Sequence, residues 1–246
     1  MRGSRRRARR VALALGGMLL AGAVALAGLW AASAVRAGAC DPDPEGRLAR
    51  DASPDVPAVD WEWWLAANPG VVAWLSVPGT AVSLPVVRAP AGDPGFYLSH
   101  DVFGTWNPHG AVYLDASCDG IDGAPCVVLF GHHSWDGTML APLAGYADED
   151  WARSHREVVV QTPDGRTRRL LVRAVDVVRA DEPVKRTEFA DEADLEAYWR
   201  ERFEAADVRL EEAPAETDQL WCLVTCSYTR WPGSERTMVL ACEDAS

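Results

Sequence analysis

The sequence predicts one mainly β domain, a mixed β-barrel of about eight strands with a few peripheral helices. From residue 71 onward the chain consists mostly of short apolar runs rich in valine, separated by Pro, Gly and Asp turns. Few helical stretches interrupt these runs, whereas a βαβ sheet would alternate strands with helices. About 200 residues follow the first apolar segment, enough for one substantial core.

The N-terminal segment predicts a membrane anchor. Residues 1–10 contain six arginines and no acid, and the 25 residues 11–35 contain no charge. A helix of roughly 20 residues spans a bilayer core. The arginines before the run and the acidic chain after it place the N-terminus inside. We therefore expect a cytoplasmic tail (1–10), a single transmembrane helix (11–35), a linker rich in Pro, Asp and Ala (36–59) and an extracytoplasmic domain (60–246).

Two other interpretations of this N-terminal segment stay open, a cleaved signal peptide and a lipoprotein site. Ala32-Ser33-Ala34 and Ala37-Gly38-Ala39 resemble cleavage sites of signal peptides. Cys40 resembles a lipoprotein site, but the large aliphatic residue three positions before it is missing. The retained anchor is favoured because the apolar run exceeds the roughly 7–15 residues of a signal peptide.

The charge of the outer part excludes one class of partner. Residues 1–36 carry seven arginines and no acid, so the remainder has 17 basic against 36 acidic residues, a net of −19. Such a surface repels phosphate backbones, so we expect no nucleic-acid binding. It suits a basic substrate or a nucleophile bearing an amine, although a solvated acidic coat is the commoner reason for such a charge. The sequence predicts no metal site and no cofactor.

Capping and turn residues separate the predicted helices and strands. Asp60 is the expected N-cap of a short helix, residues 61–67, which Asn68-Pro69-Gly70 ends. Residues 139–154 and 191–206 are the other predicted helices, the second with apolar residues at helical spacing. The predicted strands are residues 71–77, 82–87, 110–114, 126–130, 158–161, 168–178, 219–227 and 237–242.

Cys226 lies at the end of the seventh predicted strand, where a strand fixes a side chain and a loop admits substrate. A thiol attacks as its thiolate and needs a cation or base nearby. His132 and His133 follow the strand 126–130, and Arg236 begins the last strand. Antiparallel pairing of the last two strands would bring Arg236 beside Cys226, where a guanidinium can stabilise an oxyanion.

These residues occur within a longer series that resembles the class B sortases, a family of cysteine transpeptidases. Thr225-Cys226 matches the last two positions of the family's Thr-Leu-x-Thr-Cys signature, and Arg236 stands where the family's arginine does. The other matching segments are Trp61 to Leu65, Asn68 to Thr80, Leu84 to Val87, Phe96 to Asp101, Phe130 to His133 and Asp136 to Met139. The resemblance runs from about Trp61 to the end, and residues 191–206 match the helix that separates class B from smaller sortases.

The resemblance implies a closed mixed eight-stranded barrel with an N-terminal helix and a long helix between strands six and seven. It also implies that Cys226 attacks a sorting motif of a secreted protein, that His132 is the acid/base and that Arg236 stabilises the oxyanion. Thr225, Ser227 and Tyr228 would contact the substrate. An amine on a peptidoglycan precursor or a pilin would then release the acyl group.

Several assignments stay open. Neighbours on an extended chain point to opposite sides, so only one of His132 and His133 can face Cys226, and the resemblance favours His132. Asp136 and a backbone carbonyl are the candidates for orienting His132. Cys118 with Cys126 and Cys222 with Cys242 are candidate disulfides, whereas Cys222 and Cys226 are about 13 Å apart on one strand, too far to bridge.

Three functions from different classes remain in view. The first is transpeptidation that anchors proteins to peptidoglycan, with pilus assembly as its variant. Wall anchoring is favoured because the chain ends four residues after Cys242, whereas pilus-assembling sortases often carry a second membrane helix there. The second is hydrolysis of the same thioacyl intermediate. The third is a non-catalytic cell-surface binding domain.

Overall fold

The structure is a computed structural model and describes residues 56–212, 216–227 and 234–244. The predicted tail (1–10), anchor (11–35), most of the linker (36–59) and Tyr228 lie outside these residues. Among the residues described, no helix has the length and apolar character needed to cross a membrane.

Nine strands form one sheet in the order β5-β1-β2-β3-β4-β8-β9-β6-β7, and β5 also pairs with β6. The strands are β1 (Val71–Ser76), β2 (Ser83–Arg88), β3 (Val112–Leu114), β4 (Cys126–Phe130), β5 (Glu157–Gln161), β6 (Thr167–Arg179), β7 (Val208–Arg209), β8 (Leu220–Cys226) and β9 (Glu235–Glu243). The β5–β6 pairing closes eight of them into a barrel, and the two-residue β7 lies outside it on β6. The pairs β2–β3 and β4–β8 are parallel and the others antiparallel, so the predicted closed mixed barrel is confirmed.

Strands β4 and β8 are the centre of the sheet order and set the position of the site. Nearly every residue of both strands is buried, as expected for parallel strands covered on both faces. Phe130 lies beside Val224, so both strands end at the same rim of the barrel. On its other side β8 pairs antiparallel with β9, which begins at that rim.

The first predicted helix is confirmed as α2 (Trp61–Ala67), and the Trp63 N–H donates to Asp60 Oδ1 at 3.0 Å. The single helix predicted over residues 139–154 is wrong. The segment divides into the 3-10 helix η3 (Ala141–Ala147) and α4 (Glu149–Ser154). Asp148 between them has an extended backbone, and its side chain accepts a hydrogen bond from the Trp151 N–H. Its carboxylate starts a new helix instead of continuing the old one.

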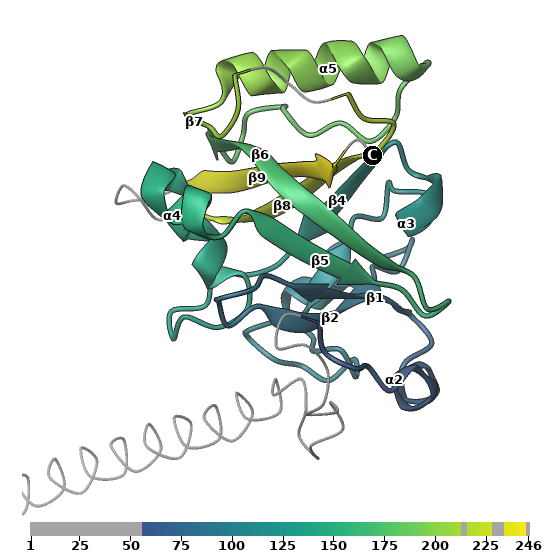
Figure 1. Cartoon of the computed structure of the whole chain (residues 1–246). Helices are drawn as coiled ribbons and strands as arrows, with labels where there is room; N and C mark the ends of the chain where they lie inside the picture. The colour runs from purple at the N-terminus through teal and green to yellow at the C-terminus, as the bar shows by residue number, and fades with distance from the viewer. Residues whose placement is uncertain (1–55, 213–215, 228–233, 245–246) are drawn as a thin grey trace, which may run out of the picture. The chain divides into compact units, whose positions relative to one another are not determined.

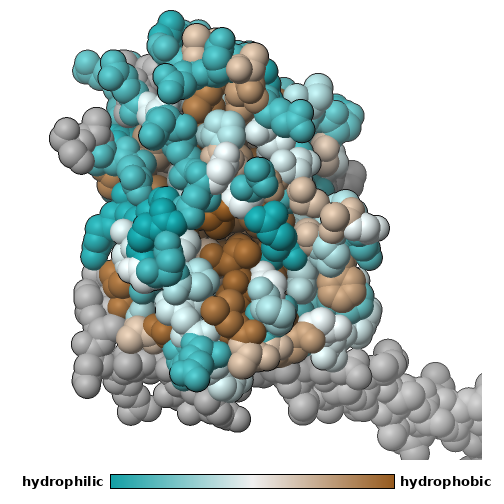
Figure 2. Space-filling model, turned by 90° about the vertical axis from the view of Figure 1, so that its right-hand side faces the viewer, coloured by the Kyte–Doolittle hydropathy of each residue, from teal (hydrophilic) through white to brown (hydrophobic). Residues whose placement is uncertain are grey.

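The predicted long helix is confirmed as α5 (Glu192–Ala205), capped by Asp191. It crosses one side of the barrel beside β6 and β7 (Figure 1). Its buried face carries Leu195, Trp199 and Phe203, which join the main core. Two short helices were not predicted, η2 (Phe96–Leu98) and α3 (Gly120–Gly123). Figure 2, a view onto the side where α3 lies in Figure 1, shows hydrophobic side chains in the middle of this face with hydrophilic ones around them.

A buried ion pair joins α5 to the barrel. Asp176 of β6 and Arg202 of α5 are 6% and 8% exposed, and Arg202 Nη1 lies 3.2 Å from Asp176 Oδ2. Burial raises the pKa of Asp176 to about 6, although Arg202 acts in the opposite direction. Desolvation of the carboxylate therefore outweighs its attraction to the guanidinium.

This pair predicts a pH dependence of stability. Because the pKa of Asp176 is higher in the folded chain than in the unfolded one, its protonation stabilises the fold below about pH 4, and this is lost as the pH rises through 6. A shift of about two pKa units corresponds to about 3 kcal/mol. We expect the unfolding free energy of the wild type to fall by about that amount relative to Asp176→Asn between pH 4 and 7.5, measured by denaturant titration.

Asp181→Asn is the matched control. Asp181 is exposed, and its hydrogen bond from Arg179 lowers its pKa, so it stays ionised over this range. The difference between the wild type and this variant should be flat. A flat difference for Asp176→Asn as well would contradict the prediction.

Candidate active site

Cys226 ends β8, is half-buried, and lies directly opposite Arg236 of β9. The Ser227 N–H donates to Glu235 O at 3.1 Å, which makes the next pair inward a non-hydrogen-bonded one. In such pairs the Cα atoms are about 4.5 Å apart and the side chains share a face. The predicted antiparallel pairing that brings Arg236 beside Cys226 is therefore confirmed.

His132 lies two residues beyond the end of β4. The Gly131 N–H donates to Val224 O at 3.2 Å, which extends the parallel β4–β8 ladder by one residue past Phe130. One further step of this register aligns His132 with Cys226, on the same side of the sheet. The ring of His132 is also held: its Nε2 lies 2.7 Å from the backbone oxygen of Leu98.

His133 contacts the nucleophile's main chain. Its Nδ1 lies 2.8 Å from the backbone oxygen of Cys226, so Nδ1–H is the donor. The backbone of His133 also bridges to Met139. Both histidines thus lie at the rim that holds Cys226, with His133 tied to the end of β8. The choice of His132 as the acid/base stays a prediction.

The loop that carries both histidines is closed on itself. The Leu140 N–H donates to His132 O at 2.9 Å. Met139 has a φ of 56°, in the left-handed region, which costs about 1–2 kcal/mol for a residue with a side chain. Such strain persists only where the surrounding structure imposes it, and it is frequent beside functional sites.

A buried histidine that the sequence analysis missed supports this loop. His109 is 7% exposed, and its Nδ1 lies 3.0 Å from Ser134 Oγ and 3.9 Å from Asp136 Oδ2. Burial acts to raise the pKa of Asp136, but hydrogen bonds from Thr138 outweigh it and hold that pKa below its usual value. The Asp136 carboxylate thus contacts Thr138 and His109. The His132 ring instead contacts the Leu98 carbonyl. The only sequence signal for His109 is its place in the Asn107–Gly110 turn.

The residues beside the nucleophile face inward. Thr225 is fully buried and Ser227 is 3% exposed. Thr225 lies opposite Thr237, and within the described part both hydroxyls are buried without a hydrogen-bond partner. In this structure Thr225 offers no surface to a peptide. Substrate contacts at Thr225 and Ser227 stay predictions, and Tyr228 lies outside the described residues.

The connection between β6 and α5 approaches the end of β4. Lys185 Nζ lies 2.7 Å from Asp115 Oδ2 and 5.9 Å from the centre of the Phe130 ring. Burial acts to raise the pKa of Asp115, but hydrogen bonds from Lys185 and Ser117 lower it overall. This connection is therefore fixed next to the strand that leads into His132.

The two candidate disulfides are wrong, since all five described cysteines are free thiols. The Cys118 Sγ is engaged with the β4 backbone, 3.5 Å from Cys126 O and 3.4 Å from Val128 N. Cys222 has Leu240 as its cross-strand partner, two residues away from Cys242. The other four thiols are at most 2% exposed, whereas Cys226 is half-buried.

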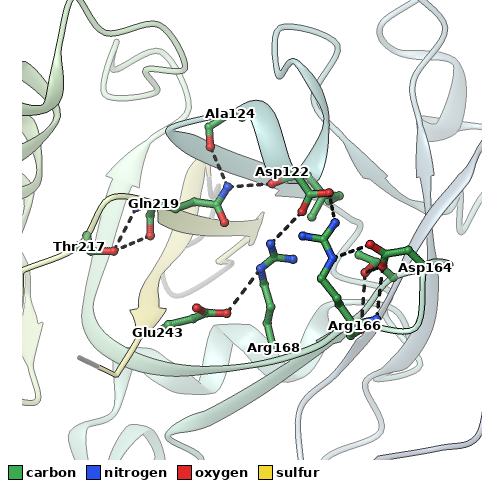
Figure 3. Close-up of polar contacts among 10 residues, drawn as sticks. Asp122, Ala124, Asp164, Arg166, Arg168, Thr217, Gln219 and Glu243 are labelled. Carbon is green, nitrogen blue, oxygen red and sulfur yellow. Dashed lines mark hydrogen bonds and ion pairs between the residues drawn. The ribbon is translucent and has the colours of Figure 1, made fainter. Parts of the chain in front are cut away.

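A second polar cluster lies at the opposite end of β8 (Figure 3). Asp122 of α3 accepts hydrogen bonds from Arg166 and Arg168 of the β5–β6 hairpin, and Gln219 donates to Ala124 O at 2.9 Å. A pocket of about 320 Å³ adjoins it. The six-residue step from Leu220 to Cys226 spans about 20 Å, so this cluster is separate from the rim. Nowhere in the described ranges do three or more His, Cys, Asp or Glu side chains gather as metal ligands.

Comparison with known proteins agrees with this geometry. No family model matches the chain. It is 21% identical over 174 residues to sortase B of Staphylococcus aureus, covering 71% of this chain and 70% of that protein, and 26% identical over 88 residues to sortase B of Listeria monocytogenes, covering 36% and 35%.

Solved structures show the same fold. The crystal structure of Clostridium perfringens sortase B matches with a TM-score of 0.68 and 22% identity, covering 75% of this chain and 99% of that one. A complex of Staphylococcus aureus sortase B with its substrate matches with a TM-score of 0.65 and 20% identity, covering 75% and 85%. The chain described here therefore has the fold of the class B sortases and resembles them in sequence.

Proposed function

We propose that this protein is a membrane-anchored cysteine transpeptidase that joins secreted proteins to an amine outside the cell. The observation that carries the proposal is the placement of Cys226, Arg236 and two histidines at one rim of a sortase B-type barrel. Cys226 is the half-buried thiol among the described cysteines, which suits a nucleophile that must meet a peptide.

The reaction has two acyl-transfer steps. The Cys226 thiolate attacks the carbonyl carbon of the sorting motif's scissile peptide bond, and Arg236 stabilises the oxyanion that forms. Protonated His132 gives its proton to the leaving amine as the C–N bond breaks, leaving a thioester on Cys226. An incoming amine then attacks this thioester, loses its proton to His132, and leaves with the acyl group as the thiolate is restored.

The charge of the outer part supports an amine acceptor. Its net charge of −19 attracts cationic molecules, and a protonated amine approaches such a surface more readily than an anion does. We propose a peptidoglycan precursor as the amine, with a pilin lysine as the alternative. The proposed substrates are secreted proteins with a sorting motif, and the similarity to the sortase B-substrate complex of Staphylococcus aureus supports a substrate of the sortase B kind. The proposed location is the cell membrane, with the helix 11–35 as anchor and the catalytic domain outside.

Transfer assays test this proposal. The full-length protein is incubated with peptides containing Asn-Pro-x-Thr or Leu-Pro-x-Thr motifs, with and without a short amine acceptor, and products are identified by mass spectrometry. We expect one motif to be cleaved after its Thr and the acyl part to appear joined to the amine. Cleavage with water as the sole acceptor in the presence of amine would make the protein a hydrolase. No cleavage of any motif would favour a non-catalytic binding domain.

A further inference from the structure

The ring of His132 lies in a cradle formed by two segments that precede it in the chain. The first is the end of η2, where the Leu98 carbonyl lies 2.7 Å from His132 Nε2. The second is Gly110, whose neighbour Ala111 donates its N–H to Tyr97 O at 2.9 Å. The two segments are therefore bonded to each other as well as adjacent to the imidazole.

The chemistry of this contact fixes the protonation of the ring. A carbonyl oxygen accepts hydrogen bonds and donates none, so Nε2 must carry a hydrogen in both the neutral and the charged imidazole. When the ring is neutral, its lone pair is then on Nδ1. Nδ1 is therefore the atom that takes up and releases the proton.

The space around the ring is closed to any side chain at position 110. Gly110 has a φ of 61°, and a Cβ built there would overlap Tyr97 O and lie 3.1 Å from His132 Cδ2 and 3.2 Å from Leu98 O. Both the backbone conformation and the contact therefore require glycine. A larger residue would push apart the imidazole and the carbonyl that holds it.

The buried His109 connects the Gly110 side of the cradle to the His132 loop. It is next to Gly110 in the chain, and its Nδ1 lies 3.0 Å from the hydroxyl of Ser134, two residues after His132. This contact joins the Gly110 turn to the loop that carries His132. The position of the imidazole is thus fixed from the Leu98 side and from the Ser134 side.

We propose that the group that orients His132 is the main-chain carbonyl of Leu98, that Gly110 is a positioning residue, and that Nδ1 of His132 exchanges the proton. This rests on the proposed acid/base role of His132. It assigns to backbone geometry the orienting task that a carboxylate performs in many Cys–His and Ser–His sites. Leu98 and Gly110 act through His132 and need no contact with substrate.

The direct test is nuclear magnetic resonance of the full-length protein with ¹⁵N-labelled histidine. The chain has five histidines, so the loss of one signal in His132→Gln assigns the ring. We expect the ¹⁵N shifts to show one neutral form, with its hydrogen on Nε2 and its lone pair on Nδ1, in place of the tautomer mixture of free histidine. A neutral form with the hydrogen on Nδ1, or the same tautomer mixture as free histidine, would overturn the proposal. This measurement needs no substrate, so its failure is distinct from failure of the transfer assay.

Gly110→Ala tests the positioning role, with Gly165→Ala as the matched control. Gly165 has a φ of 87° but no atom within 4 Å of a Cβ built there, so it shares the backbone strain without the contact. We expect Gly110→Ala to show the tautomer mixture of free histidine at His132 and to lower kcat about 100-fold, the cost of a misplacement of about 1 Å. Gly165→Ala should keep the single tautomer and the wild-type kcat. Equal kcat for the two variants would overturn the proposal. If Gly110→Ala does not fold, the tautomer of His132 in the wild-type protein tests the proposal instead.

Discussion

Replacing Cys226 by alanine is expected to abolish transfer, with a fall in rate of about 10⁴-fold or more, because the proposed thioester forms on the Cys226 thiol. Mass spectrometry of the wild type with a motif peptide and no amine should show the acyl adduct on Cys226, and the variant should show none. The fold should be retained, since Cys226 is half-buried at the end of β8 and its alanine keeps the backbone pairing with Arg236.

The four other cysteines that the structure describes provide the control for this result. Burial raises the pKa of the Cys126 thiol to about 12 and that of Cys222 well above its usual value. Burial also raises the pKa of Cys118 and of Cys242. At neutral pH these four thiols hold little thiolate, so an alkylating reagent should modify Cys226 and spare them. Modification of Cys222 before Cys226, or an acyl adduct that survives in Cys226→Ala, would count against the assigned nucleophile.

The second large effect is expected at His132. His132→Ala removes the proposed acid/base and should lower kcat by about 10²–10⁴-fold, the usual contribution of such a group. His133→Ala removes one hydrogen bond to the Cys226 carbonyl, worth about 1 kcal/mol, so we expect about a fivefold effect. Both variants are measured as kcat and KM in the transfer assay.

The pair also discriminates between the two histidines. The His132→Ala variant should lose the ionisation of the acid/base from the pH–rate profile, and His133→Ala should keep it. The reverse order of effects would move the acid/base role to His133, whose Nδ1 is already committed to a carbonyl. Equal large effects would mean that the position of Cys226 depends on its tie to His133 as much as on proton transfer.

The barrel was predictable because its signals are local. All eight of its strands come within two residues of the predicted ranges at each end, since β-branched runs bounded by turn residues specify a strand without reference to the rest of the chain. Asp60 likewise marked the start of α2, and the helical spacing of apolar residues predicted α5. The prediction over residues 139–154 failed because apolar spacing alone does not reveal a break, and the capping carboxylate of Asp148 was overlooked.

The disulfide candidates show the limit of spacing arguments. The eight-residue separation of Cys118 and Cys126 permits a bridge, yet the Cys118 thiol lies against the β4 backbone. The strand register rules out the second candidate, Cys222 with Cys242, since Cys222 lies opposite Leu240. Cross-strand register depends on how all the strands pack together, and a shift of two residues leaves the apolar pattern unchanged.

By itself, the sequence determined the fold class, the acidic character of the chain after residue 36, and the three residues Cys226, His132 and Arg236 that define the proposed chemistry. The tertiary structure decided what surrounds them: that Arg236 lies opposite Cys226, that His133 is tied to the Cys226 carbonyl, and that Leu98 and Gly110 hold His132. The physical reason is that a main-chain carbonyl and an absent side chain leave no chemical signature in a sequence. Leu98 and His132 are 34 residues apart, and only the closed barrel brings that carbonyl to the imidazole.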